Sequence, residues 1–132
     1  MDRAEYERKR EAISRQGAAQ RSSLERELAI KHNEDKRFAV RVEEAESIVG
    51  RELFGVSERV ASGLLPDSLM VEIDAATARL RRFQDTAEDE VCSRAVRRRE
   101  RENRLQDVID DCRMRLARLD DEFAGGRRGT AD

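Results

Sequence analysis

The sequence holds few residues that could carry out covalent chemistry. His32 is its only histidine, and it lies in the polar stretch KHNEDK with no cysteine near it in the sequence. A Ser-His or Cys-His nucleophile pair would have to use this one residue. The glycines form neither a GxGxxG nor a GxxxxGK(S/T) phosphate-binding loop. We therefore predict no catalytic residue and no enzymatic activity.

The sequence also gives no reason to expect a metal or cofactor site. Cys92 and Cys112 lie outside any CxxC or Cys/His spacing. A helical di-metal site needs two E-x-x-H units, which a single histidine cannot supply. We interpret neighbouring carboxylates such as Glu88 and Glu90 as solvated side chains that pair with arginines at i, i+4 spacing. The prediction is no metal ion and no cofactor.

The composition favours charges that are paired on long helices. Of the 132 residues, 42% are charged and only 4% are aromatic, yet 27 basic and 29 acidic side chains leave a net charge of −2. This balance differs from the one-signed bias of a disordered or nucleic-acid-coating tail. No apolar run reaches the roughly 18 residues of a membrane span, and the start lacks a signal-peptide pattern. We expect a cytoplasmic protein without membrane insertion, with signal-less export as the alternative.

The only proline divides the chain into two arms. Pro66 lies in the stretch ASGLLPDS, where Gly63 stops one helix and Asp67 or Ser68 can cap the next. The pattern predicts an all-α, antiparallel two-helix hairpin. It forms one domain over residues 1–124, with a helix over about 3–60, a turn over about 61–68 and a helix over about 69–123.

Glycines mark the weak points of the two predicted helices. Gly125 and Gly126 end the second helix and leave residues 125–132 as a flexible tail. Gly50 and Gly55 each cost about 1 kcal/mol relative to alanine in a helix interior. A break there would give a short third helix over about 51–61, and the sequence leaves open whether this break occurs.

Apolar residues in both arms follow the alternating spacing of three and four that is typical of coiled-coil a and d positions. In a hairpin that turns near residue 65, residue i lies opposite about residue 130 − i. This register pairs Tyr6 with Phe123 and Leu24 with Leu105, and it matches the polar stretch 31–36 with 94–99. We call the strip of apolar residues between the arms the interhelical seam.

The arginine-rich stretch RAVRRRERENR, residues 94–104, superficially resembles the basic region of a bZIP protein. Acidic residues interrupt it and DTAEDE precedes it, so we expect no nucleic-acid binding and keep a DNA-binding coiled coil as a disfavoured alternative. We predict instead a polar layer that fixes the register of the hairpin. Its residues are Glu34 and Asp35 in the first arm and Arg97, Arg98 and Arg99 in the second.

A seam between only two helices leaves apolar edges exposed, so we expect a protein partner with amphipathic helices or self-association. The turn adds a small apolar cluster that closes the hairpin or docks a partner. The candidate partner-binding residues are Leu24, Leu28, Phe38, Val42, Leu64, Leu65, Leu105, Ile109, Leu116 and Leu119.

In size, central turn and heptad-patterned arms, the chain resembles the small helical-hairpin partner proteins of LXG toxins in type VII secretion. The WxG tripeptide of related secretion proteins is absent, and the turn reads SGLLPD. An aromatic residue four before an acid, as in the family's export signal, occurs as Phe54 with Glu58, away from the C-terminal end. The resemblance implies an adaptor or targeting chaperone that binds the helical segment of a secreted protein. A coiled-coil stalk or chaperone component of a flagellar or type III export apparatus is the second resemblance.

Overall fold

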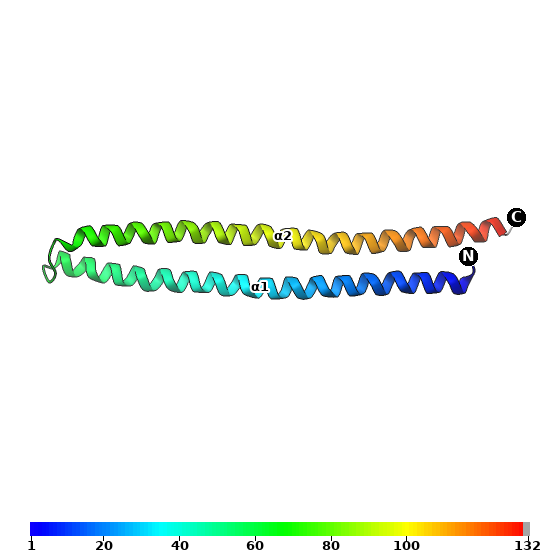
Figure 1. Ribbon diagram of the computed structural model, residues 1–132, viewed down its shortest axis with the longest axis horizontal. Coiled ribbons are helices and arrows are strands. Elements are labelled where there is room, and N and C mark those ends of the chain that lie inside the picture. Colours follow the sequence, from blue (N-terminus) through cyan, green and yellow to red (C-terminus); the bar gives the residue numbers. More distant parts are fainter. Residues whose placement is uncertain (131–132) are drawn as a thin grey trace. The chain divides into compact units, whose positions relative to one another are not determined.

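The computed structural model describes the backbone of residues 1–130 and the side chains of residues 1–126. It consists of two long helices, α1 (Arg3–Ala61) and α2 (Leu69–Thr130), joined by a turn (Figure 1). Within the described backbone there is no β-strand. The predicted all-α two-helix hairpin is confirmed.

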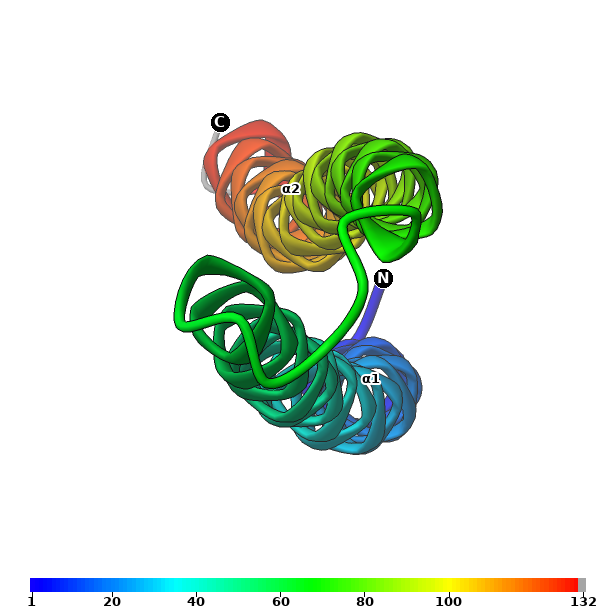
Figure 2. The ribbon, with the colours of Figure 1, turned by 90° about the vertical axis from the view of Figure 1, so that its left-hand side faces the viewer.

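The chain forms two compact units, each built from a segment of α1 and a segment of α2. The turn unit comprises residues 32–97 and includes the loop seen end-on in Figure 2. The terminal unit comprises residues 1–31 and 98–130. We describe each unit separately.

Local capping explains where the two helices begin and end. The Asp2 carboxylate accepts a 2.7 Å hydrogen bond from the backbone N–H of Glu5, so Asp2 is the N-cap of α1. At the other end Gly63 has a φ of +74°, and the N–H groups of Gly63 and Leu64 donate to the carbonyls of Val60 and Arg59. This pair of bonds is a Schellman motif, which needs a left-handed residue that glycine supplies without strain.

The structure answers one question about glycine that the sequence left open, and it corrects one prediction. α1 is continuous through Gly50 and Gly55, so no third helix forms over 51–61. α2 continues through Gly125 and Gly126 to Thr130, where a flexible tail was expected, and residues 131–132 lie outside the described part. In the described chain only Gly63 adopts a positive φ. A glycine that keeps helical angles costs about 1 kcal/mol but breaks no backbone hydrogen bond.

Contacts across the two helices confirm the predicted register in each unit. In the terminal unit the rings of Tyr6 and Phe123 stack with centroids 4.2 Å apart, and Arg101 pairs with Glu27 at 3.6 Å. In the turn unit Arg94 pairs with Asp35 at 3.0 Å. Each pair places residue i close to residue 130 − i on the other helix.

The hairpin buries little. Among the described side chains the buried ones are apolar: Val60, Ile73 and Ala87 in the turn unit and Leu119 in the terminal unit. The remaining seam residues are half-buried or exposed, because each helix has one neighbour and its seam is open at both edges. Within the described residues neither helix holds an apolar stretch able to cross a lipid bilayer.

Candidate functional site

An apolar groove runs between α1 and α2 in the turn unit. We call it the Phe groove, after the two aromatic residues in its wall, and its volume is about 610 Å³. Phe83 keeps 43% of its surface exposed here although it occupies a seam position. The lining residues are Phe38, Arg41, Val42, Phe83, Thr86, Ala87, Asp89, Glu90 and Ser93.

Helical spacing and side-chain size together create this groove. Phe38 and Val42 are four residues apart on α1, and Phe83 and Ala87 are four apart on α2, so each pair projects from one face of its helix. Ala87 is buried but carries only a methyl group. A methyl group beside two phenyl rings cannot fill the space between the helices, so a groove remains between them.

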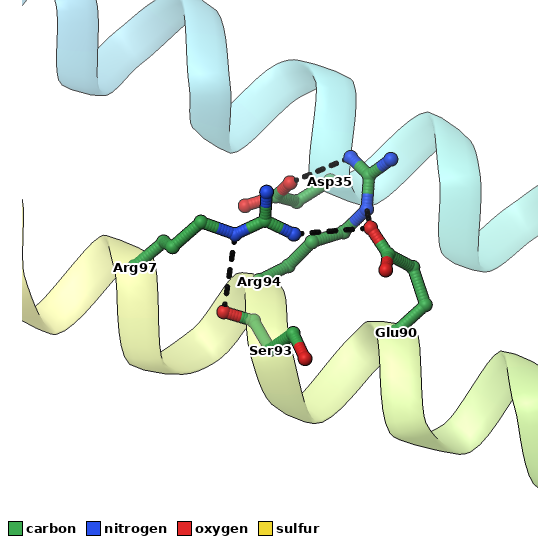
Figure 3. Close-up of polar contacts among 5 residues, drawn as sticks. All are labelled: Asp35, Glu90, Ser93, Arg94 and Arg97. Carbon is green, nitrogen blue, oxygen red and sulfur yellow. Dashed lines mark hydrogen bonds and ion pairs between the residues drawn. The ribbon is translucent and has the colours of Figure 1, made fainter.

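A cluster of charged residues adjoins the Phe groove (Figure 3). The guanidinium carbon of Arg94 lies 4.3 Å from the centroid of the Phe38 ring, while its Nη1 and Nε bond to Asp35 Oδ1 at 3.0 Å and Glu90 Oε1 at 3.1 Å. Arg97 Nη2 bonds to the same Glu90 oxygen at 3.0 Å. Because Phe38 and Glu90 also line the groove, the cluster and the groove form one surface. We call these four charged residues together with Phe38 the Arg94 cluster.

Arg94 is held as a cation within the interface between the helices. Its side chain is 28% exposed and that of Asp35 only 18%. The hydrogen bond to Asp35 is the main cause that raises the pKa of Arg94 above its ordinary value, and Glu90 adds to it. Cation–π contact with Phe38 further compensates the partial loss of water around the guanidinium group.

The predicted polar layer is wrong in its choice of arginines. Asp35 does reach across to α2, but its partner is Arg94. Arg97 instead donates to Glu90 and to the Ser93 carbonyl on its own helix. The reason is helical phase, because Arg94 is seven residues from the buried Ala87 and therefore shares its face.

The other members of that layer lie elsewhere on the helices. Arg98 pairs with Glu102 of α2 at 3.8 Å, and both Glu34 and Arg99 are exposed. In the terminal unit Arg101, which lies seven residues beyond Arg94, makes a cross-helix ion pair with Glu27.

Two smaller grooves lie along the same hairpin. The Leu53 groove of the turn unit measures about 330 Å³ and is lined by Val49, Glu52, Leu53, Val56, Leu69, Glu72, Ile73 and Ala76. The Ile13 groove of the terminal unit measures about 300 Å³ and is lined by Ala12, Ile13, Gln16, Arg115, Arg118, Leu119 and Glu122.

The terminal unit is fastened by a second polar cluster. Asp120 accepts a hydrogen bond from the Tyr6 hydroxyl and one from Arg10 at 2.7 Å. The hydrogen bond from the Tyr6 hydroxyl is the main cause that lowers the pKa of Asp120, and the same hydrogen bond raises the pKa of Tyr6. These contacts link the beginning of α1 to the last turns of α2.

The structure distributes the predicted partner-binding residues over both units. Phe38 and Val42 line the Phe groove and Leu119 lines the Ile13 groove. Leu64 projects from the turn and is exposed, whereas Leu65 is half-buried. The other predicted residues are half-buried in the seam of the terminal unit, namely Leu24, Leu28, Leu105, Ile109 and Leu116.

Sequence reasoning missed Phe83 and Arg41 as groove residues. The available signal was the spacing of Ile73, Leu80, Phe83 and Ala87, in which a small residue follows a large one on the same face. That signal marks a hollow only when the residues on the facing helix are also known.

The surfaces described above consist mainly of apolar and charged side chains. No group of three or more His, Cys, Asp or Glu side chains is placed to hold a metal ion in the described part of the chain, and His32 is exposed. The polar groups of the Phe groove and the Arg94 cluster are carboxylates and guanidinium groups, which recognise opposite charges. Comparison with protein-family models, curated proteins and solved structures finds no match to this chain.

Proposed function

We propose that this chain is a non-enzymatic protein that binds amphipathic helices. In this proposal it is a cytoplasmic adaptor or targeting chaperone, and its partner is the helical segment of a secreted protein, as in type VII-like systems. The Phe groove is the observation that carries the proposal, because it is an apolar depression of helical dimensions that the hairpin leaves uncovered.

The exposed surface of the chain supports a role in binding. It exposes 10171 Å², whereas a globular monomer of 15.2 kDa exposes roughly 7,100 Å². Part of this excess is apolar surface on the walls of the grooves. Covering such surface with a partner helix gains about 25 cal/mol for each Å² of apolar area.

The rim of the Phe groove limits which helices fit. Arg41 on the α1 side and Asp89 on the α2 side form no ion pair within the residues that the structure describes. A helix with apolar residues at positions i, i+3, i+4 and i+7 would cover Phe38 and Phe83. A carboxylate on one flank and a basic residue on the other would then meet Arg41 and Asp89.

The test is co-expression with the helical N-terminal segments of secreted proteins encoded beside this gene, followed by size-exclusion chromatography. Phe83→Asp should abolish co-elution by placing a charge in the groove. Phe54→Asp is the matched control, because Phe54 is 65% exposed and lies outside the grooves described above. Equal binding by both variants, or no complex with the unaltered chain, would refute the proposal.

A further inference from the structure

We propose that the helix that binds the turn unit carries a diagonal pattern of four charges. At one level it has an acidic residue on one flank and a basic residue on the other, and about three turns further along the two are exchanged. The inference rests on the proposed function, since it names the chemistry of the partner helix. It follows from four charged residues beside the grooves, which we call the charge quartet: Arg41 and Glu52 on α1, and Arg79 and Asp89 on α2.

The Phe groove and the Leu53 groove lie on one face of the turn unit. Along α2, Ala76 lines the Leu53 groove, while Phe83 and Glu90 line the Phe groove at intervals of seven residues. On α1, Val49 lines the Leu53 groove and Val42, seven residues before it, lines the Phe groove. Positions seven apart share a face of a helix in a coiled coil. The two grooves therefore form one continuous strip, which a single partner helix can follow.

The middle of this strip is apolar and exposed. Ile48, Val49 and Phe83 are 54%, 39% and 43% exposed. Ile48 is seven residues after Arg41 and four before Glu52, and both of those residues line a groove. An apolar stripe of a partner helix would remove these side chains from water. The charged residues at the borders of the strip then decide which amphipathic helices fit.

Three members of the charge quartet line the grooves. Arg41 and Asp89 line the Phe groove, and Glu52 lines the Leu53 groove. All three side chains are exposed. They therefore border the strip where the flanks of a partner helix would lie.

The fourth member, Arg79, lies on α2 between the two grooves. It is seven residues after Glu72, which lines the Leu53 groove, and seven before Thr86, which lines the Phe groove. It therefore shares their face of the helix, and it is exposed. Arg82, seven residues before Asp89, is also exposed and adds positive charge on the α2 side of the strip.

The register of the hairpin arranges the charge quartet in two opposite pairs. In the turn unit residue i lies close to residue 130 − i on the other helix, as the cross-helix ion pair at 3.0 Å shows. Arg41 and Asp89 therefore lie at one level. Glu52 and Arg79 lie at a second level, about 16 Å nearer the turn. The arginine is on α1 at the first level and on α2 at the second, so the two pairs are crossed.

The charge quartet is available for pairing with another molecule. None of its members forms an ion pair within the residues that the structure describes. Arg94 and Arg97 of the same unit, by contrast, pair with carboxylates of the chain itself. The two members at each level stand on opposite borders of the strip. A helix lying between them can offer a carboxylate to each arginine and a basic group to each carboxylate.

The crossed arrangement selects partners by charge pattern, whichever way the partner helix runs. A half-turn about an axis perpendicular to the strip exchanges the two levels and the two helices. It therefore brings arginine onto arginine and carboxylate onto carboxylate. A helix with the complementary pattern makes four attractions whether it runs parallel or antiparallel to α1, and a helix with the opposite pattern meets four repulsions in both directions.

Binding of two synthetic peptides to the full chain tests this inference. Both are amphipathic helices of about 25 residues, or roughly 37 Å, with the same apolar stripe, composition and net charge. The matched peptide places glutamates opposite the two arginines and lysines opposite the two carboxylates, and the exchanged peptide has these glutamates and lysines interchanged. Fluorescence anisotropy should give the matched peptide a dissociation constant about tenfold lower or more, because four attractions replace four repulsions.

Variants with exchanged charges show whether the quartet causes this preference. Glu52→Arg combined with Arg79→Glu keeps the net charge, and each peptide then makes two attractions and two repulsions. The two dissociation constants should come within about twofold of each other. Glu58→Arg combined with Arg81→Glu is the matched control and should keep the preference, because both residues are exposed and line neither groove. Circular dichroism checks that each variant is helical.

Equal affinity of the unaltered chain for the two peptides, or binding of neither at about 100 µM, would overturn the inference. So would a preference that survives the exchange at Glu52 and Arg79 as fully as it survives the control exchange. Equal binding of both peptides that Phe83→Asp abolishes would remove the charge pattern and leave the proposed function in place. Failure of the proposed function itself appears separately, in the co-expression test.

Discussion

In the terminal unit the two helices approach each other closely at Gly17. A Cβ atom added to Gly17 would lie 2.6 Å from the Sγ atom and 3.1 Å from the Cβ atom of Cys112 on α2. At Gly50, by contrast, an added Cβ atom meets nothing within 4 Å. Both glycines lie inside α1, so the two positions differ in the facing helix and not in backbone structure. We predict opposite effects when each is replaced by alanine.

The expected magnitudes follow from two opposing terms. Alanine is favoured over glycine in a helix interior by about 1 kcal/mol, so Gly50→Ala should increase the free energy of unfolding by about that amount. Gly17→Ala gains the same term, but the methyl group must displace Cys112, and such overpacking costs about 1–3 kcal/mol. The net effect of Gly17→Ala should therefore lie between about zero and a loss of about 2 kcal/mol.

Urea unfolding followed by far-ultraviolet circular dichroism measures both variants. A third variant, Cys112→Ala, removes the sulfur atom and should make Gly17→Ala more favourable than it is in the unaltered chain. The double-mutant cycle isolates this coupling from helix propensity. If Gly17→Ala stabilises the protein as much as Gly50→Ala does, or if Cys112→Ala leaves its effect unchanged, α1 and α2 do not approach each other at Gly17 as described.

Two further predictions concern the polar clusters of the two units. Arg94→Ala should lower the free energy of unfolding by about 2 kcal/mol, because it leaves Asp35 without a cationic partner inside the interface. Arg97→Ala should lower it by less than about 1 kcal/mol, because Arg97 is more exposed. Similar losses for the two variants in urea unfolding would contradict the roles assigned to them. The pKa of Asp120 is lowered in the folded chain, so its carboxylate stabilises the fold when the pH is above the ordinary aspartate pKa of about 4. This stabilisation is lost as the pH falls through the lower pKa of the folded state. Stability of the unaltered chain should therefore fall more steeply between about pH 5 and about pH 2 than that of Asp120→Asn, and parallel pH profiles would refute the link.

Local signals in the sequence predicted the hairpin well. Gly63 and Pro66 concentrate the stop signals in one short stretch, and the spacing of apolar residues in each arm fixes which faces meet. The register could be predicted because pairs such as Tyr6 and Phe123 match only when the turn lies near residue 65. These signals depend on a few neighbouring residues, so they do not require knowledge of the packed structure.

The sequence left a question open where effects of similar size compete, and it led to an error where helical phase decides the contact. Gly50 weakens α1 by about 1 kcal/mol, but a break would also cost backbone hydrogen bonds and seam contacts, and the helix continues. Arg97 was chosen because the register matches residues 31–36 with residues 94–99, whereas helical phase selects Arg94 within that stretch. The candidate site could be predicted only in part, since Phe38 and Val42 were expected, but the hollow beside them depends on Ala87 of the facing helix.

The Arg94 cluster connects the register of the turn unit with its open groove. Two helices with a purely apolar heptad seam can shift by seven residues with little loss of packing. In this hairpin the same shift would separate Asp35 from Arg94 and break their ion pair in the interface. An ion pair at this position therefore specifies one register. It does so by occupying a seam position that an apolar side chain could have filled, and its guanidinium group lies over the ring of Phe38, which also lines the Phe groove. The contact that fixes the alignment of the helices thus also leaves apolar surface beside it for another helix to cover.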